Sequence, residues 1–230
     1  NPEEVTTVMK TLNVLSCPSL SEVDARNVST LTGTIDLSQC PRLRKALFGG
    51  SSAGEIILPK GSKIEEFELP STITNLSLVN LPKLTEEGLK VGELSALTYL
   101  RIEGSDTPAF AILKASFDAD APLTNIRLVG FDYDGDANDL TMLAELANGN
   151  YAGIDADGTR NPNILPVIEG TINIDGSVYE DDVNVLKEAY GNALTINVTG
   201  GYYIKFADPE QLEAAYPSTR VFWAGVKFNF

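Results

Sequence analysis

Two short stretches, LNVLSCPSL at 12–20 and IDLSQCPRL at 35–43, follow one pattern. Each has two apolar residues separated by one position, then a cysteine three residues later, and a leucine three residues after the cysteine. Cys17 and Cys40 are the only cysteines in the chain, and each is followed by proline. The pair is compatible with a disulfide, a metal site or a repeated structural unit.

The same frame recurs along the chain, which favours a repeat. Its two apolar positions are filled by Leu12 and Val14, Ile35 and Leu37, Ile56 and Leu58, Leu76 and Leu78, Leu100 and Ile102, Ile126 and Leu128, Ile172 and Ile174, and Ile196 and Val198. The spacing is about 20 to 26 residues, except for one step about twice as long between Leu128 and Ile174. This period indicates short parallel strands whose alternate side chains point inwards.

The pattern resembles that of the leucine-rich repeat family, in which a small residue such as Cys or Asn closes each turn. The stretch IILPKGSKIEEFELPSTITNLSLVNLPKLTEEGL at 56–89, together with LTYLRIEG and GIDADG, is similar to leucine-rich segments in large virion proteins of phages and prophages of gut bacteria. The resemblance covers about residues 10 to 200. It implies a mostly β solenoid of about eight coils with short helices.

We expect this solenoid to occupy residues 1–200, and residues 201–230 to form a C-terminal β-rich cap of the same domain. Cys17 and Cys40 would then be equivalent buried positions in successive coils. A disulfide between neighbouring coils stays an alternative in an oxidising compartment. Two cysteines without any histidine cannot complete a four-ligand zinc site.

Between the expected strands, local patterns predict further elements. They are one or two helical turns near 1–10, an extended back wall at 64–73, helices at 84–97, 136–149 and 208–217, a protruding loop at 148–170, and an aromatic strand at 220–230.

Composition excludes several functions. The net charge is −15, which repels phosphate backbones and disfavours nucleic-acid binding. No run of residues is long and apolar enough to span a bilayer, so we expect no membrane insertion. The absence of histidine removes the commonest general base, and no fingerprint singles out a carboxylate pair among the acidic residues. We therefore expect no enzymatic activity and no cofactor.

The non-core residues of the strands would line one face of the sheet, a common binding surface in repeat proteins. On it, Tyr99, Arg101, Glu103, Asn125 and Arg127 fall on adjacent expected strands and combine an aromatic ring with two guanidinium groups. We take these five as the candidate binding residues. The alternative is that both arginines only pair with nearby carboxylates on a solvated sheet.

The stretch FDYDGDANDL at 131–140 offers a second candidate. Its acidic and amide residues alternate as in a calcium loop, but it lacks the glycine and the final glutamate of that motif. An Asx-rich turn before a helix beginning near Asp139 is the alternative.

The resemblance implies a non-catalytic structural or recognition module on the exterior of a phage virion, in a tail, fibre or similar part. Its partners would be other virion proteins or a cell-surface receptor. The alternative is a bacterial cell-surface or secreted adhesin that binds host protein or glycan. A carbohydrate-active enzyme is a third possibility, which would require one specific essential carboxylate.

Overall fold

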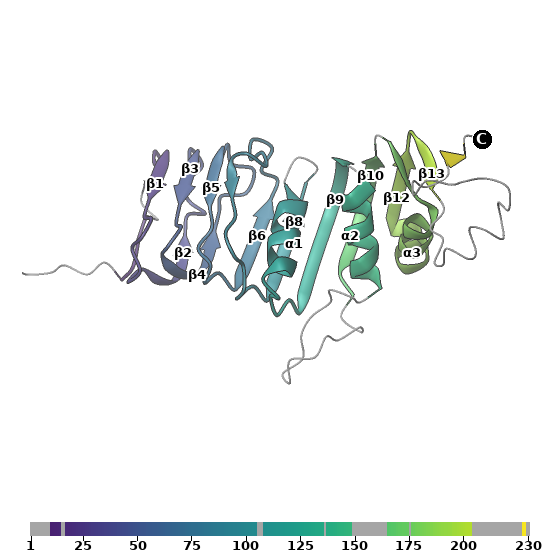
Figure 1. Ribbon diagram of the computed structural model, residues 1–230. Coiled ribbons are helices and arrows are strands. Elements are labelled where there is room, and N and C mark those ends of the chain that lie inside the picture. The colour runs from purple at the N-terminus through teal and green to yellow at the C-terminus, as the bar shows by residue number, and fades with distance from the viewer. Residues whose placement is uncertain are drawn as a thin grey trace, which may run out of the picture.

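A long parallel sheet runs through the molecule from end to end (Figure 1). The computed structural model describes residues 10–14, 17–104, 108–135, 137–148, 165–174, 176–203 and 227–228. The sheet has seven strands in the order β12-β10-β9-β8-β6-β4-β2. These strands are β2 (Thr32–Asp36), β4 (Ser52–Ile57), β6 (Asn75–Val79), β8 (Tyr99–Glu103), β9 (Asn125–Gly135), β10 (Val167–Ile174) and β12 (Leu194–Val198).

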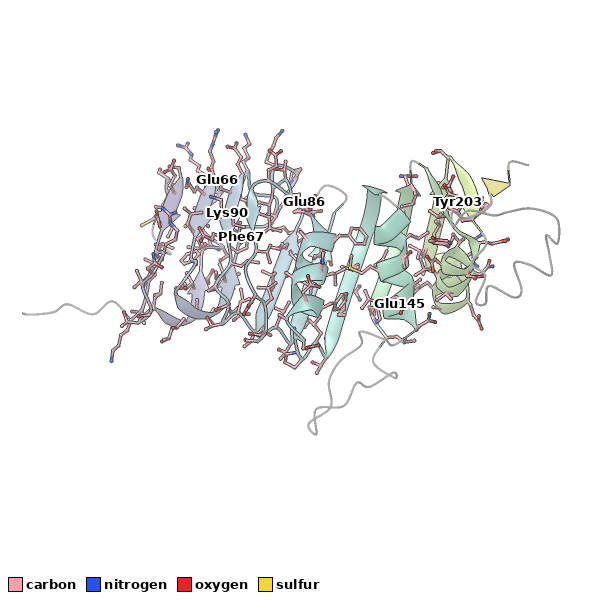
Figure 2. All side chains as sticks on the ribbon, in the orientation of Figure 1. Glu66, Phe67, Glu86, Lys90, Glu145 and Tyr203 are labelled. Carbon is pink, nitrogen blue, oxygen red and sulfur yellow. The ribbon has the colours of Figure 1, made fainter. Side chains whose placement is uncertain are left out.

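Two smaller sheets accompany it. The first has the order β1-β3-β5-β7, all parallel, with β1 (Glu22–Asp24), β3 (Lys45–Leu47), β5 (Glu66–Glu68) and β7 (Leu89–Lys90). The second comprises β11 (Ser177–Tyr179), β13 (Gly201–Tyr203) and β14 (Lys227–Phe228), and its β13–β14 pair is antiparallel. Figure 2 labels Phe67 on β5 of the first small sheet and Tyr203 on β13 of the second.

Among the described residues, three helices follow in the chain after β8. They are α1 (Ala109–Asp118), α2 (Ala137–Ala147) and α3 (Glu180–Tyr190), and a 3-10 turn η1 (Gly191–Ala193) follows α3. Figure 1 shows the helices on the same side of the long sheet. Helices between parallel strands are the usual crossover connection, because parallel neighbours cannot be joined by a tight turn.

The core lies between the long sheet and the layer that covers it. Along β6 the side chains of Leu76 and Leu78 are buried, whereas those of Asn75 and Ser77 are exposed. Phe67 of the opposite sheet is also fully buried and belongs to the same apolar cluster. The period-two alternation of each strand therefore separates a continuous core from an open polar face.

The expected fold class is wrong. In place of a mostly β solenoid of about eight coils with a C-terminal β cap, the described residues form three sheets of mainly parallel strands and three helices, an α/β arrangement. The connecting segments after Glu103 are long enough for helices of 10 or 11 residues, which the repeat period alone does not indicate. Strand β9 also runs for 11 residues, about twice the length expected from one repeat.

Several local expectations are settled as well. The helix at 136–149 is confirmed as α2, and the extended segment at 64–73 contains β5. The helix expected at 84–97 is wrong, since that segment contains β7 and otherwise turns and irregular backbone. The helical turn at 1–10, most of the loop at 148–170, the helix at 208–217 and most of the strand at 220–230 lie outside the described residues.

The two cysteines occupy matching turns but different environments. The N–H of Cys17 donates to Val14 O, and that of Cys40 donates to Leu37 O, each at 2.9 Å. Cys40 is buried and Cys17 is exposed, so the expectation that both are buried is wrong for Cys17. Cys40 is covered by the segment around Val14, since its Sγ lies 3.7 Å from Val14 O. Both thiols are free.

The sharpest test of the inward and outward alternation uses neighbouring residues of β6. We expect Leu78→Asp to lower the free energy of unfolding by more than about 4 kcal/mol, because it places an unpaired charge in the core. Ser77→Asp, on the exposed face, is expected to change it by less than about 1 kcal/mol. Chemical denaturation followed by circular dichroism measures both. Similar values for the two variants would show that the faces are misassigned.

A second test addresses the close approach of Gly88 to the neighbouring chain segment. A Cβ at Gly88 would lie 1.9 Å from the backbone oxygen of Glu65, whereas one at Gly92 would meet nothing within 4 Å. We expect Gly88→Ala to cost about 3 kcal/mol of unfolding free energy, and Gly92→Ala to change it by less than about 1 kcal/mol. Equal stability of both variants in denaturant titrations would contradict the described β5–β7 packing.

Candidate functional site

Strand pairing brings the predicted binding residues together on the open face of the long sheet. Tyr99 on β8 pairs with Asn125 on β9, and Arg101 pairs with Arg127. Glu103 ends the same strand, two residues after Arg101. Asn125 is exposed and the other four are half-buried, while the intervening Leu100 and Ile102 point into the core.

Arg101 is held in place by Glu103. Its Nε and Nη2 both donate to Glu103 Oε1, the former at 2.9 Å. The pKa of Arg101 is raised, first by the hydrogen bond to Glu103, and the neighbouring Tyr99 adds a smaller contribution in the same direction. Arg101 therefore has the carboxylate partner that the alternative interpretation expected. The pairing fixes the side chain on the face and leaves it 39% exposed.

Arg127 has no ion pair within the described part of the chain. Two guanidinium groups at directly paired positions repel each other, and Glu103 compensates only one of them. On its other side Arg127 pairs with the exposed Val167 of β10. The repeat alignment, which placed Ile172 in the frame of Ile126, is wrong here: Ile172 pairs with Tyr133, because β9 continues past Gly130.

A shallow groove of about 510 Å³ adjoins Tyr99 and Arg101. It extends across β8, β6 and β4 and into the turn that follows β4. Its other lining residues are Glu55, Ile56, Ile57, Leu58, Pro59, Lys60, Asn75, Leu76, Ser77 and Val79. The sequence placed Ile57, Asn75 and Ser77 on this face but not in the binding site, and it gave no signal for Pro59 and Lys60.

The groove wall at Pro59 and Lys60 arises from one extra residue. Ile57 pairs with Ser77, and the N–H of Gly61 then donates to Val79 O. In the regular part of the ladder, the residue that follows a paired residue donates its N–H to the carbonyl oxygen of the pair's other member. After the Asp36–Ile57 pair, for example, the N–H of Leu37 donates to Ile57 O. By the same rule, Lys60 lies opposite Val79. The segment from Ile57 to Lys60 therefore advances three residues while the facing segment from Ser77 to Val79 advances two. Such an insertion bends the strand end and re-aims its side chains.

The floor of the groove combines apolar and polar groups. Ile57 is 38% exposed and places aliphatic surface on this open face. Glu55 accepts a hydrogen bond of 2.9 Å from Thr34 Oγ1 of the next strand. Asn75 and Ser77 on β6 pair with Glu55 and Ile57, are exposed, and present an amide and a hydroxyl. Such a surface can hold a ligand that has one apolar face and several hydrogen-bonding groups.

A second hollow of about 580 Å³ lies beside the four-stranded sheet and is lined by Arg26, Glu68 and Lys90, among others. Its cations already have partners. Arg26 pairs with Asp24, and Lys90 shares Glu66 with Lys45 at 3.7 and 2.8 Å. Glu66 and Lys90 lie near each other in Figure 2. These cross-strand pairs stabilise strand order and leave little charge for a ligand.

The calcium candidate at 131–140 is not a loop. Residues 131–135 continue β9, and α2 begins at Ala137 rather than near Asp139. The side chains of residues 131–139 lie outside the described part of the structure. Among the side chains that are described, no group of three or more acidic or cysteine residues could hold a metal ion.

Comparisons with protein-family models, with curated proteins and with solved structures gave no match. None of the helices in the described segments has the length and apolar character needed to cross a membrane.

The Asp24–Arg26 pair offers a titration test of the charge pattern beside the second hollow. A hydrogen bond from the Arg26 side chain lowers the pKa of Asp24 from 3.8 to about 2. Because the folded pKa lies below the unfolded one, the stabilisation is present above about pH 4 and is lost as the pH falls towards 2. We expect NMR titration to place the Asp24 midpoint near 2 in the wild type and higher, but still below 3.8, in Arg26→Gln, because the backbone N–H of residue 26 continues to donate to Asp24. An unchanged midpoint in the variant would contradict the pairing.

Proposed function

We propose that this chain is a non-catalytic recognition module that binds its partner through the open face of strands β4, β6 and β8. The observation that carries the proposal is the groove beside the fixed Arg101–Glu103 pair. An arginine that is already oriented loses less conformational entropy when a ligand binds. The exposed Ile57 adds apolar area at the centre of the same surface.

The chemistry of the groove supports binding rather than turnover. Its one carboxylate, that of Glu55, accepts a hydrogen bond from Thr34, and the nearby Glu103 outside the lining holds Arg101. The chain has no histidine to act as a general base near neutral pH. A glycoside hydrolase would need two carboxyl groups flanking the bond to be broken, and the groove lining contains one, that of Glu55.

We further propose that the module belongs to the exterior of a phage virion, in a tail, fibre or similar part, where it contacts other virion proteins or a cell-surface receptor. The support is the similarity of residues 56–89 to leucine-rich segments of such proteins. A bacterial cell-surface or secreted adhesin is the second candidate, and the same open polar face favours it equally.

Immunogold electron microscopy of the producing culture distinguishes the two locations. We expect an antibody raised against the 230-residue chain to label virus particles. Label confined to cell envelopes would overturn the virion proposal and favour the adhesin.

The recognition role is tested separately by competition. Purified chain is expected to reduce attachment of the labelled particles to cells. A Tyr99→Ala, Arg127→Ala variant with unchanged circular dichroism is expected to have lost this effect. If the wild type does not compete, or the variant competes equally well, the open face is not the recognition surface.

A further inference from the structure

The groove is bordered by positive charge that the protein leaves available. Lys60 is exposed, and within the described part of the chain it forms no ion pair. Arg101 retains donors beyond the two that Glu103 accepts, because a guanidinium group carries five N–H donors. Arg127 adjoins Arg101 on the next strand. The one carboxylate in the groove lining, that of Glu55, is already hydrogen-bonded to Thr34.

The geometry points to a carboxylate-bearing sugar unit of a cell-surface glycan, such as a uronic or sialic acid residue, as the ligand of this groove. The assignment rests on the recognition function proposed above and specifies its ligand. The sugar carboxylate lies between Lys60 and Arg101, which border the same groove from the turn after β4 and from β8. Charge-assisted hydrogen bonds of this kind are roughly twice as strong as neutral ones.

The rest of the groove suits a sugar ring. Ile57, Val79 and the ring of Tyr99 give an apolar surface for the C–H face of a pyranose. Asn75 and Ser77 supply donors and acceptors for its hydroxyl groups. The volume of about 510 Å³ falls within the range of small-ligand sites.

An extended peptide fits the groove less well. Strands β4, β6 and β8 are each paired on both sides, so their backbone groups are already hydrogen-bonded. A peptide therefore cannot add as a further strand, which is the usual source of affinity for extended peptides on sheets. Recognition has to use side chains alone, as the binding of a sugar does.

The overall charge of −15 does not prevent this binding. At physiological salt the Debye length is about 8 Å, so distant carboxylates are largely screened while Lys60 and Arg101 act at contact. Binding of a single carboxylated sugar unit next to these cations is therefore favoured. A long polyphosphate chain would extend beyond them and be repelled by the surrounding acidic residues.

Isothermal titration calorimetry with matched probes tests the assignment. The sugar probes are tetragalacturonate, its fully methyl-esterified form, 3′-sialyllactose and lactose, and tetraglutamate is the peptide probe; each is titrated into the full chain at about 0.15 M salt. We expect at least one carboxylated probe to bind at least about tenfold more tightly than its neutral counterpart. Lys60→Gln is expected to weaken that binding about tenfold, and Lys83→Gln, an exposed lysine outside the groove lining, to leave it unchanged.

Four results would overturn the assignment. These are no binding of either carboxylated probe, equal binding of acidic and neutral probes, an unchanged affinity in Lys60→Gln, and equally tight, Lys60-dependent binding of tetraglutamate. If neutral and acidic probes bind equally and this binding is lost in Tyr99→Ala, the ligand does not need a carboxylate. Recognition by the open face would then still stand. Tetraglutamate binding would likewise preserve the recognition face and change the ligand to an acidic peptide.

Discussion

The whole structure depends on the register of the parallel strands in the long sheet. From β2 to β9 each strand places its apolar residues at paired positions, so that Ile35, Ile56 and Leu76 follow one another in the core. Because side chains alternate with a period of two, a shift by one residue would exchange the core and the open face. The same constraint places Tyr99 and Arg101 beside Asn125 and Arg127. The placement of these four side chains is therefore a consequence of the core pattern.

The groove depends on a local departure from this regularity. One extra residue between Ile57 and Gly61 bends the chain, so that Pro59 and Lys60 line the groove. The insertion adds a wall and a cation to a surface that would otherwise be flat. A regular sheet thus supplies rigid positions for the ligand contacts, and a single irregular turn supplies the shape.

Part of this arrangement can be predicted from sequence because strand alternation is a local property. The inner positions from Ile35 to Leu128 and the outer placement of Arg101 follow from the apolar pattern. Part of the covering layer does not, because α1 is apolar over most of its length and its 3.6-residue period is hard to see. Helix α3 carried a readable signal, with Glu180, Asp181 and Asp182 in its first turn and Gly191 after its end. The fold class and the role of Lys60 required the structure, since both depend on how one segment packs against another.

Hydroxyl-radical footprinting tests the central claim that the open face of β4, β6 and β8 is the recognition surface. The chain is oxidised with and without cell-surface polysaccharide purified from the producing culture, and side-chain modification is read by mass spectrometry. Ile57 and Tyr202 are matched probes, since they are 38% and 36% exposed on different parts of the molecule. The account predicts that polysaccharide protects Ile57 and Tyr99 and leaves Tyr202 reactive. Unchanged reactivity of Ile57 and Tyr99, with protection of Tyr202, would contradict it.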